Sequence, residues 1–255
     1  MKNAIYAEIY KLTRYRLLWF TPIYYMVLGI SYARFDHYSL HTCQGLAFFA
    51  LPPLARFTFP LGVAVVTAFA IGGDFTHRTF QNALYIGISK RDYFFSRLFV
   101  QFLLTSALCG TGMLTHTFWR LLFFRTEADS SMEMPGRKLA VYLLVILLQF
   151  WVYTAVYNAL CYFVKNQLKS IALSLVIMYL EAVFYQVSNA WQLESAAGML
   201  RFLPSIVLKY SFDGYAYYDR IFTFGFLRFG LSAFLMTVII SVIGYMKFRS
   251  DGGMG

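Results

Sequence analysis

Long apolar stretches separated by short polar segments dominate the chain. Six of them are long enough to be membrane-spanning helices, since about 20 apolar residues cross the hydrocarbon core of a bilayer. They cover residues 17–33, 46–71, 93–118, 139–164, 171–187 and 221–245. Backbone groups within lipid must be hydrogen-bonded internally, and continuous apolar runs lack the alternation of a membrane barrel. The pattern predicts an all-α integral membrane protein, with residues 1–255 forming a single transmembrane domain.

The second stretch is the least regular of the six. Pro52, Pro53, Pro60 and Arg56 all lie in its first half. Proline removes a backbone donor and kinks or ends a helix. We expect the helix to start after Pro53 and to bend at Pro60, which would place Arg56 near the outer headgroups.

Residues 1–16 precede the first span and have their own pattern. Ile5, Ile9 and Leu12 recur at helical spacing, whereas Glu8 and Lys11 lie on other faces. This pattern is typical of an amphipathic helix in the membrane interface. A plain extension of the first span is the alternative.

Composition and charge agree with a membrane protein. Hydrophobic residues make up 59% and charged residues 13% of the chain, against roughly 45–50% and 25% in soluble domains. If both termini are inside the cell, 12 of the 22 Lys and Arg residues lie on the inner side. The net charge of +10 then matches an anionic inner membrane surface, and no nucleic acid partner is needed to explain it.

Catalytic and metal-binding motifs are not found in the sequence. It contains no GxxxxGK[ST] phosphate loop, no HExxH and no GxSxG. His37, His41 and Cys43 lie close together, but no set of carboxylates completes a metal site, so we interpret them as solvated loop residues. We therefore expect no enzyme activity and no cofactor in this chain.

Two charged residues fall inside predicted spans. Glu181 lies about 15 Å deep in the fifth span, at about 1.5 Å per residue, and Arg228 lies near the outer end of the sixth. A lipid-facing charge at depth is costly. Either the two residues line a translocation path, or they form a structural ion pair.

Residues 72–92 form a polar, basic segment between the second and third spans. Asp74 is placed to cap a short helix beginning near Phe75. Gly87 would end the segment, after which Lys90, Arg91 and Arg97 return to the headgroups. A short amphipathic helix followed by a break suits a lever that a soluble partner can push; an ordinary connector is the alternative.

The stretch GGDFTHRTFQNALYIGISKRDYFFSRL, together with the N-terminal interfacial helix and six spans, resembles the permease subunits of type-2 ABC transporters. The resemblance implies that residues 72–92 are a coupling helix that docks in a cytoplasmic ATPase. The positions that match are Asp74, Phe75, Arg78, Thr79, Phe80, Asn82, Leu84, Gly87, Lys90 and Arg91. It also implies a pair of short re-entrant helices on the outer side, for which residues 188–220 are the counterpart.

The same resemblance implies an exporter. A second permease copy, identical or related, would complete the path in the lipid bilayer, and two copies of a separate ATPase would bind ATP and Mg. Small six-span permeases of this kind resemble those that export peptides or toxins from bacteria. We expect a multi-pass protein of the bacterial plasma membrane, with cytoplasmic termini and an amphipathic peptide or other hydrophobic substrate. A membrane scaffold or sensor, and a channel or secondary carrier, are the alternatives.

Overall fold

The computed structural model describes residues 2–14, 16–39, 55–76, 79–85, 87–123, 136–190, 204 and 226–250, and the elements within them are all helical. This confirms the predicted all-α membrane class. The elements are α1 (Lys2–Arg14), α2 (Arg16–Ser39), α3 (Ala55–Thr67), η2 (Ala68–Gly72), α4 (Gly73–Thr76), α5 (Thr79–Tyr85), α6 (Lys90–Phe123), α7 (Gly136–Val164), α8 (Gln167–Ala190) and α12 (Phe226–Ser250).

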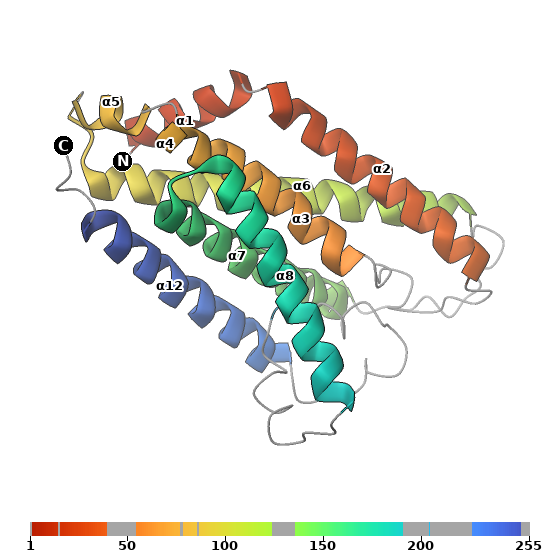
Figure 1. Cartoon of the computed structure of the whole chain (residues 1–255). Coiled ribbons are helices and arrows are strands. Elements are labelled where there is room, and N and C mark those ends of the chain that lie inside the picture. Colours follow the sequence, from red (N-terminus) through yellow and green to blue (C-terminus); the bar gives the residue numbers. More distant parts are fainter. Residues whose placement is uncertain are drawn as a thin grey trace.

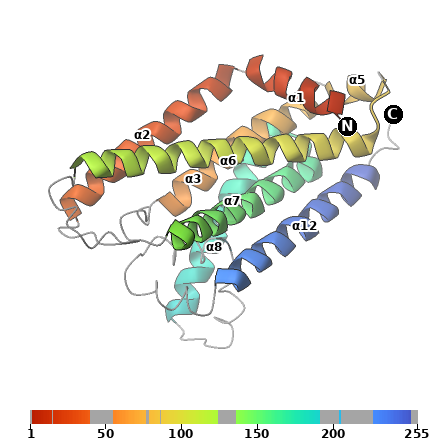
Figure 2. The same ribbon diagram turned by 180° about the vertical axis from the view of Figure 1, so that it is seen from behind.

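Helix α7 is the centre of the bundle. It packs against α12, α3, α6 and α8, whereas α2 packs mainly along α6. The start of α1, the short helices α4 and α5, the start of α6 and the end of α12 lie together at one end, which we call the α1 end (Figures 1 and 2). The segment predicted to couple to a partner is therefore beside the N-terminal helix.

Five of the described helices are long and apolar enough to cross a membrane. Their candidate spans are Thr58–Phe75, Lys90–Trp119, Leu143–Val164, Gln167–Phe184 and Arg228–Ser250. Helix α2 corresponds to the first predicted span, but its apolar stretch is shorter, Phe20–Ser31. The sixth span thus stays a prediction.

The end of the second span differs from the prediction. The helix becomes π-helical over Ala68–Gly72, which is η2, and leads past Ile71 directly into α4, which begins at Gly73. Asp74 is therefore inside a helix, and the prediction that it caps a helix beginning near Phe75 was wrong. The prediction that the segment breaks at Gly87 is confirmed, because the φ of 88° at this residue is a backbone conformation that favours glycine.

Small residues bring α2, α3 and α6 close together. A Cβ atom on Gly29 of α2 would lie 2.8 Å from the carbonyl oxygen of Gly112 on α6. The hydroxyls of Tyr24 and Tyr25 donate to the backbone carbonyls of Thr58 and Phe59 on α3, at 3.2 and 2.7 Å. Close backbone approach and interhelical hydrogen bonds are the usual means of helix association in lipid.

The buried apolar side chains form two clusters. One surrounds Tyr25, Phe59 and Phe150 in the middle of the bundle. The other lies at the α1 end, where the rings of Phe94 and Tyr162 are 5.0 Å apart between α6 and α7. The second cluster packs directly beneath the segment predicted to bind a partner.

Several predictions lie outside the described residues. They concern residues 46–54 of the second span, Arg78, His41, Cys43, and the outer segment 188–220 apart from the end of α8 and Pro204, whereas Pro60 lies inside α3. The side chains of His37 and Arg56 are likewise not described.

Candidate functional site

The segment between the second and third spans folds as two short helices at the α1 end. Helix α4 continues from η2, α5 follows it, and Gly87 turns the chain into α6. The turn is closed by hydrogen bonds from the backbone N–H of Gly87 to the carbonyl of Leu84, at 3.0 Å, and from that of Ile88 to the carbonyl of Ala83, at 3.2 Å. The chain thus passes from α5 toward α6 through a hydrogen-bonded turn.

Asp74 is the centre of a buried charge cluster below this segment. Its side chain is 1% exposed and forms ion pairs with Lys11 of α1 and Arg97 of α6. The hydroxyl of Tyr93 donates a hydrogen bond to Asp74 Oδ2 at 3.0 Å. A single carboxylate therefore joins α4 to both α1 and α6.

Arg97 carries the remaining contacts of the cluster. Its Nε donates to Glu8 Oε1 at 3.0 Å, and its Nη2 lies 2.9 Å from the same oxygen. Its Nη1 donates to the carbonyl of Ala70 in η2 at 3.5 Å. The guanidinium carbon lies 4.3 Å from the centre of the Tyr93 ring, a cation–π contact.

These four charged side chains balance one another. Lys11 and Arg97 face Asp74 and Glu8, so the cluster has no net charge when all four are ionised. A buried charge is stable only when it is paired and hydrogen-bonded, so for the Asp74–Arg97 pair, whose side chains are 1% and 3% exposed, losing one partner typically costs about 3–5 kcal/mol. The cluster therefore fixes the position of α4 relative to α1 and α6, and we call it the charge tether.

Sequence reasoning did not find the charge tether. It placed Arg97 at the headgroups, whereas the structure places its side chain in the interior, 3% exposed. It assigned Glu8 and Lys11 to the polar faces of an interfacial helix. The signal in the sequence is an arginine within the apolar run YFFSRLF, where a charge needs a buried partner.

The described residues of the predicted docking motif divide into two groups. Asp74 and Phe75 face the interior, and the Phe75 ring lies 5.6 Å from that of Tyr162. Arg91 is exposed, while Leu84 and Lys90 are partly exposed. Thr79, Phe80 and Asn82 belong to α5, but their side chains are not described. The exposed side chains of α5 include Gln81 and Tyr85, which the sequence motif did not single out.

Glu181 and Arg228 lie on different helices, α8 and α12. The hydroxyl of Tyr153 on α7 donates to Glu181 Oε2 at 2.6 Å. Arg228 is exposed near the start of α12, and the ion pairs of the described residues do not join it to Glu181. A role for either residue in translocation stays a prediction.

Lys11 has an unusual environment for a lysine. Burial, followed by the nearby charge of Arg97, lowers the pKa of Lys11 from 10.5 to about 7, while Glu8 acts in the opposite direction. Its side chain is 22% exposed. The charge on one end of the tether can therefore change near neutral pH.

Lys11 should make the stability of the fold depend on pH. Between about pH 7 and 10.5 the folded state binds fewer protons at Lys11 than the unfolded state, so this residue favours folding increasingly as pH rises. Below about pH 7 both states are protonated, and the effect is constant. Relative to Lys11→Met, the wild type should gain on the order of 1 kcal/mol from pH 6.5 to 9, a value reduced for partial exposure.

Thermal unfolding in detergent at several pH values measures this difference. Lys169→Met removes an exposed lysine near the start of α8 and is the matched control for loss of charge. If the melting temperatures of the wild type and of Lys11→Met changed in parallel with pH, this result would contradict the lowered pKa of Lys11.

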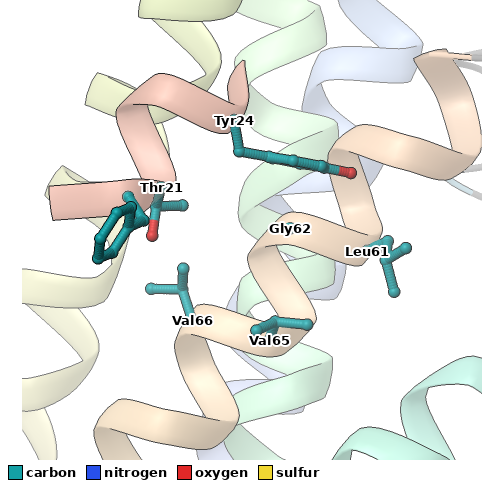
Figure 3. A pocket seen from close by; sticks show the side chains of 7 residues that line it. Thr21, Tyr24, Leu61, Gly62, Val65 and Val66 are labelled. Carbon is teal, nitrogen blue, oxygen red and sulfur yellow. The ribbon is translucent and has the colours of Figure 1, made fainter. Parts of the chain in front are cut away.

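A separate pocket of about 230 Å³ lies between α2 and α3 (Figure 3). Its lining is almost entirely apolar, and Thr21 and Tyr24 face Gly62 and Val66 across it. Pockets for drug-sized ligands have about 300–1,000 Å³. This one therefore has room for a single apolar side chain or a short length of acyl chain.

Comparison with known families finds a match over most of the chain. A family model described as ABC-2 family transporter protein matches residues 4–181. The match begins in α1 and ends in α8, so it includes the whole charge tether and the segment between the second and third spans. No curated protein matches the chain.

Proposed function

Since the chain belongs to the ABC-2 family of transporter proteins, we propose that it is the permease subunit of an ATP-driven exporter whose separate ATPase docks on residues 73–91. Permeases of this family are transport components and are not themselves catalytic. The five apolar helices that the structure describes fit a multi-pass permease.

The docking proposal rests on one combined observation: the charge tether holds α4 in place, and the neighbouring helix α5 carries exposed side chains. Asp74 holds α4 to α1 and α6 through ion pairs. On α5, Gln81 is exposed, and Tyr85 is 88% exposed. Tyrosine is among the residue types enriched at protein-binding hot spots.

Force applied to this segment would reach the membrane through the charge tether. Arg97 is in α6 and also contacts η2, so a push on α4 acts on two spans at once. Interfaces of this kind move between discrete arrangements rather than deforming smoothly. This geometry suits a lever between an ATPase and the spans.

The remaining parts of the proposal follow the family. Two ATPase copies would bind ATP and Mg, and a second permease copy would complete the path. The α1 end would face the cytoplasm of a bacterial cell, with both termini there. An amphipathic peptide or other hydrophobic substrate suits a chain in which the pocket beside α2 is apolar.

Docking can be tested by replacing Tyr85. Tyr85→Ala should weaken binding of the ATPase at least about tenfold, as expected for a hot-spot residue, without changing the melting temperature of the permease. The control is Tyr6→Ala, because Tyr6 is also an exposed tyrosine at the α1 end but lies on α1. Each ABC ATPase encoded near the gene is co-purified with the permease variants in detergent, and its affinity is measured.

Two results would contradict the proposal. Unchanged ATPase binding by Tyr85→Ala and by other α5 variants would exclude docking on this segment. A stable complex whose ATP hydrolysis responds neither to amphipathic peptides nor to other hydrophobic compounds would favour the alternative of a membrane scaffold or sensor that binds a cytoplasmic protein.

A further inference from the structure

A row of polar side chains leads inward from the charge tether along α6. Arg97, Gln101 and Thr105 are four residues apart, so they share one face of the helix, and each is 3% exposed. Their spacing is readable in the sequence, but burial of all three is a property of the packed bundle.

The facing helix α7 carries a matching row. The hydroxyls of Thr105 and Thr154 are 2.9 Å apart, which sets the register of the two helices. The helices are antiparallel, because the Phe94 ring near the start of α6 contacts the Tyr162 ring near the end of α7. One turn from the threonine pair toward the α1 end, Gln101 of α6 therefore comes opposite Asn158 of α7.

Several atoms in this layer and one turn nearer the α1 end have no hydrogen-bond partner among the described residues. They are Oε1 of Gln101, both amide atoms of Asn158 and the hydroxyl of Tyr162. Asn158 and Tyr162 are each 1% exposed. Buried polar atoms in native proteins are almost always hydrogen-bonded, to protein or to ordered water.

We propose that Gln101, Asn158 and Tyr162 form a binding site for internal water between α6 and α7. The unsatisfied groups are neutral donors and acceptors, two amides and one hydroxyl, on facing or successive turns of α6 and α7. A buried water typically makes about three hydrogen bonds, and this set of groups can supply them. The groups next to the site are the guanidinium of Arg97 on one side and the Thr105–Thr154 pair on the other.

Water at this position has a mechanical consequence. It satisfies the polar atoms without joining α6 directly to α7 at the layer next to the charge tether. Hydrogen bonds through water can be exchanged as the helices shift, so α6 could follow a movement of α4 without leaving amide groups unsatisfied.

Hydroxyl-radical footprinting of the full chain in lipid nanodiscs tests the proposal without any partner protein. Radicals generated from bound water label adjacent side chains even when these are buried. Tyr162 should be oxidised severalfold faster than Tyr25, which is 0% exposed and whose hydroxyl donates to Phe59. Tyr93, whose hydroxyl donates to Asp74 near the same end of the bundle, is the control for depth.

The double variant Gln101→Leu/Asn158→Leu should lower the labelling of Tyr162 to the level of Tyr25. Wild-type labelling of Tyr162 no faster than that of Tyr25 would overturn the water site, whether or not the double variant folds. Equal labelling of Tyr162 in the wild type and a folded double variant would also overturn it, because access would then come from opening of the bundle. The experiment leaves the proposal of ATPase docking untouched.

Discussion

Arg97→Ala is expected to produce the largest loss of stability among single substitutions at the site. It removes the cation from a pocket in which Asp74 is 1% exposed, and it also leaves Glu8 without two of its contacts. Breaking a buried pair by removing one partner costs about 3–5 kcal/mol. The apparent melting temperature in detergent should fall by roughly 10 °C.

Arg91→Ala is the matched control, since Arg91 is an exposed arginine on the same helix, and it should leave the melting temperature nearly unchanged. The neutral pair Asp74→Asn/Arg97→Gln should lose less stability than Arg97→Ala, because it removes the two most buried charges together, and the charges that remain, Lys11 and Glu8, are opposite in sign and less buried. If Arg97→Ala has the same melting temperature as the wild type, the charge tether does not hold the segment in place.

Gly29→Ala is expected to separate α2 from α6, and Gly29→Leu more strongly. The added Cβ would lie 2.8 Å from the carbonyl oxygen of Gly112 and 2.9 Å from the backbone nitrogen of His116. Both are backbone atoms of α6, so they cannot move aside as a flexible side chain would. Overpacking of this kind typically costs about 1–3 kcal/mol, and α2 has few contacts beyond α6 to compensate.

Gly110→Ala is the control for this experiment. Gly110 is on α6, two residues before Gly112, but an added Cβ there meets nothing within 4 Å. Unfolding in detergent should show a loss of stability for Gly29→Ala and little change or a small gain for Gly110→Ala, since alanine favours a helix. Equal effects of the two substitutions would mean that close approach of α2 and α6 does not stabilise the bundle.

Much of the architecture could be predicted from the sequence because lipid imposes simple requirements. Residues within the bilayer core must be helical. The apolar runs therefore predicted each end of α6, α7, α8 and α12 to within five residues. The boundary at Gly87 was predicted because its backbone conformation is one that glycine adopts without strain. The prediction failed after Ile71, where the helix passes through η2 into α4.

The polar segment between the second and third spans was recognised in the sequence, but the division between its buried and exposed side chains was not. The motif treated Asp74 and Arg91 alike, although the Asp74 carboxylate is buried in the charge tether and the Arg91 side chain is exposed. Tyr85, the most exposed aromatic residue described at the α1 end, was not singled out. Which face of a short helix points outward depends on what packs beneath it.

The sequence by itself determined that this is a helical membrane protein with a polar segment between two spans that breaks at Gly87, because run length and glycine placement act locally. Only the tertiary structure decided how that segment is held. Asp74 contacts Lys11 across 63 residues of chain, and Arg97 contacts Glu8 across 89. A charge acquires its partner through the packing of helices distant in sequence, and burial then makes that partner indispensable.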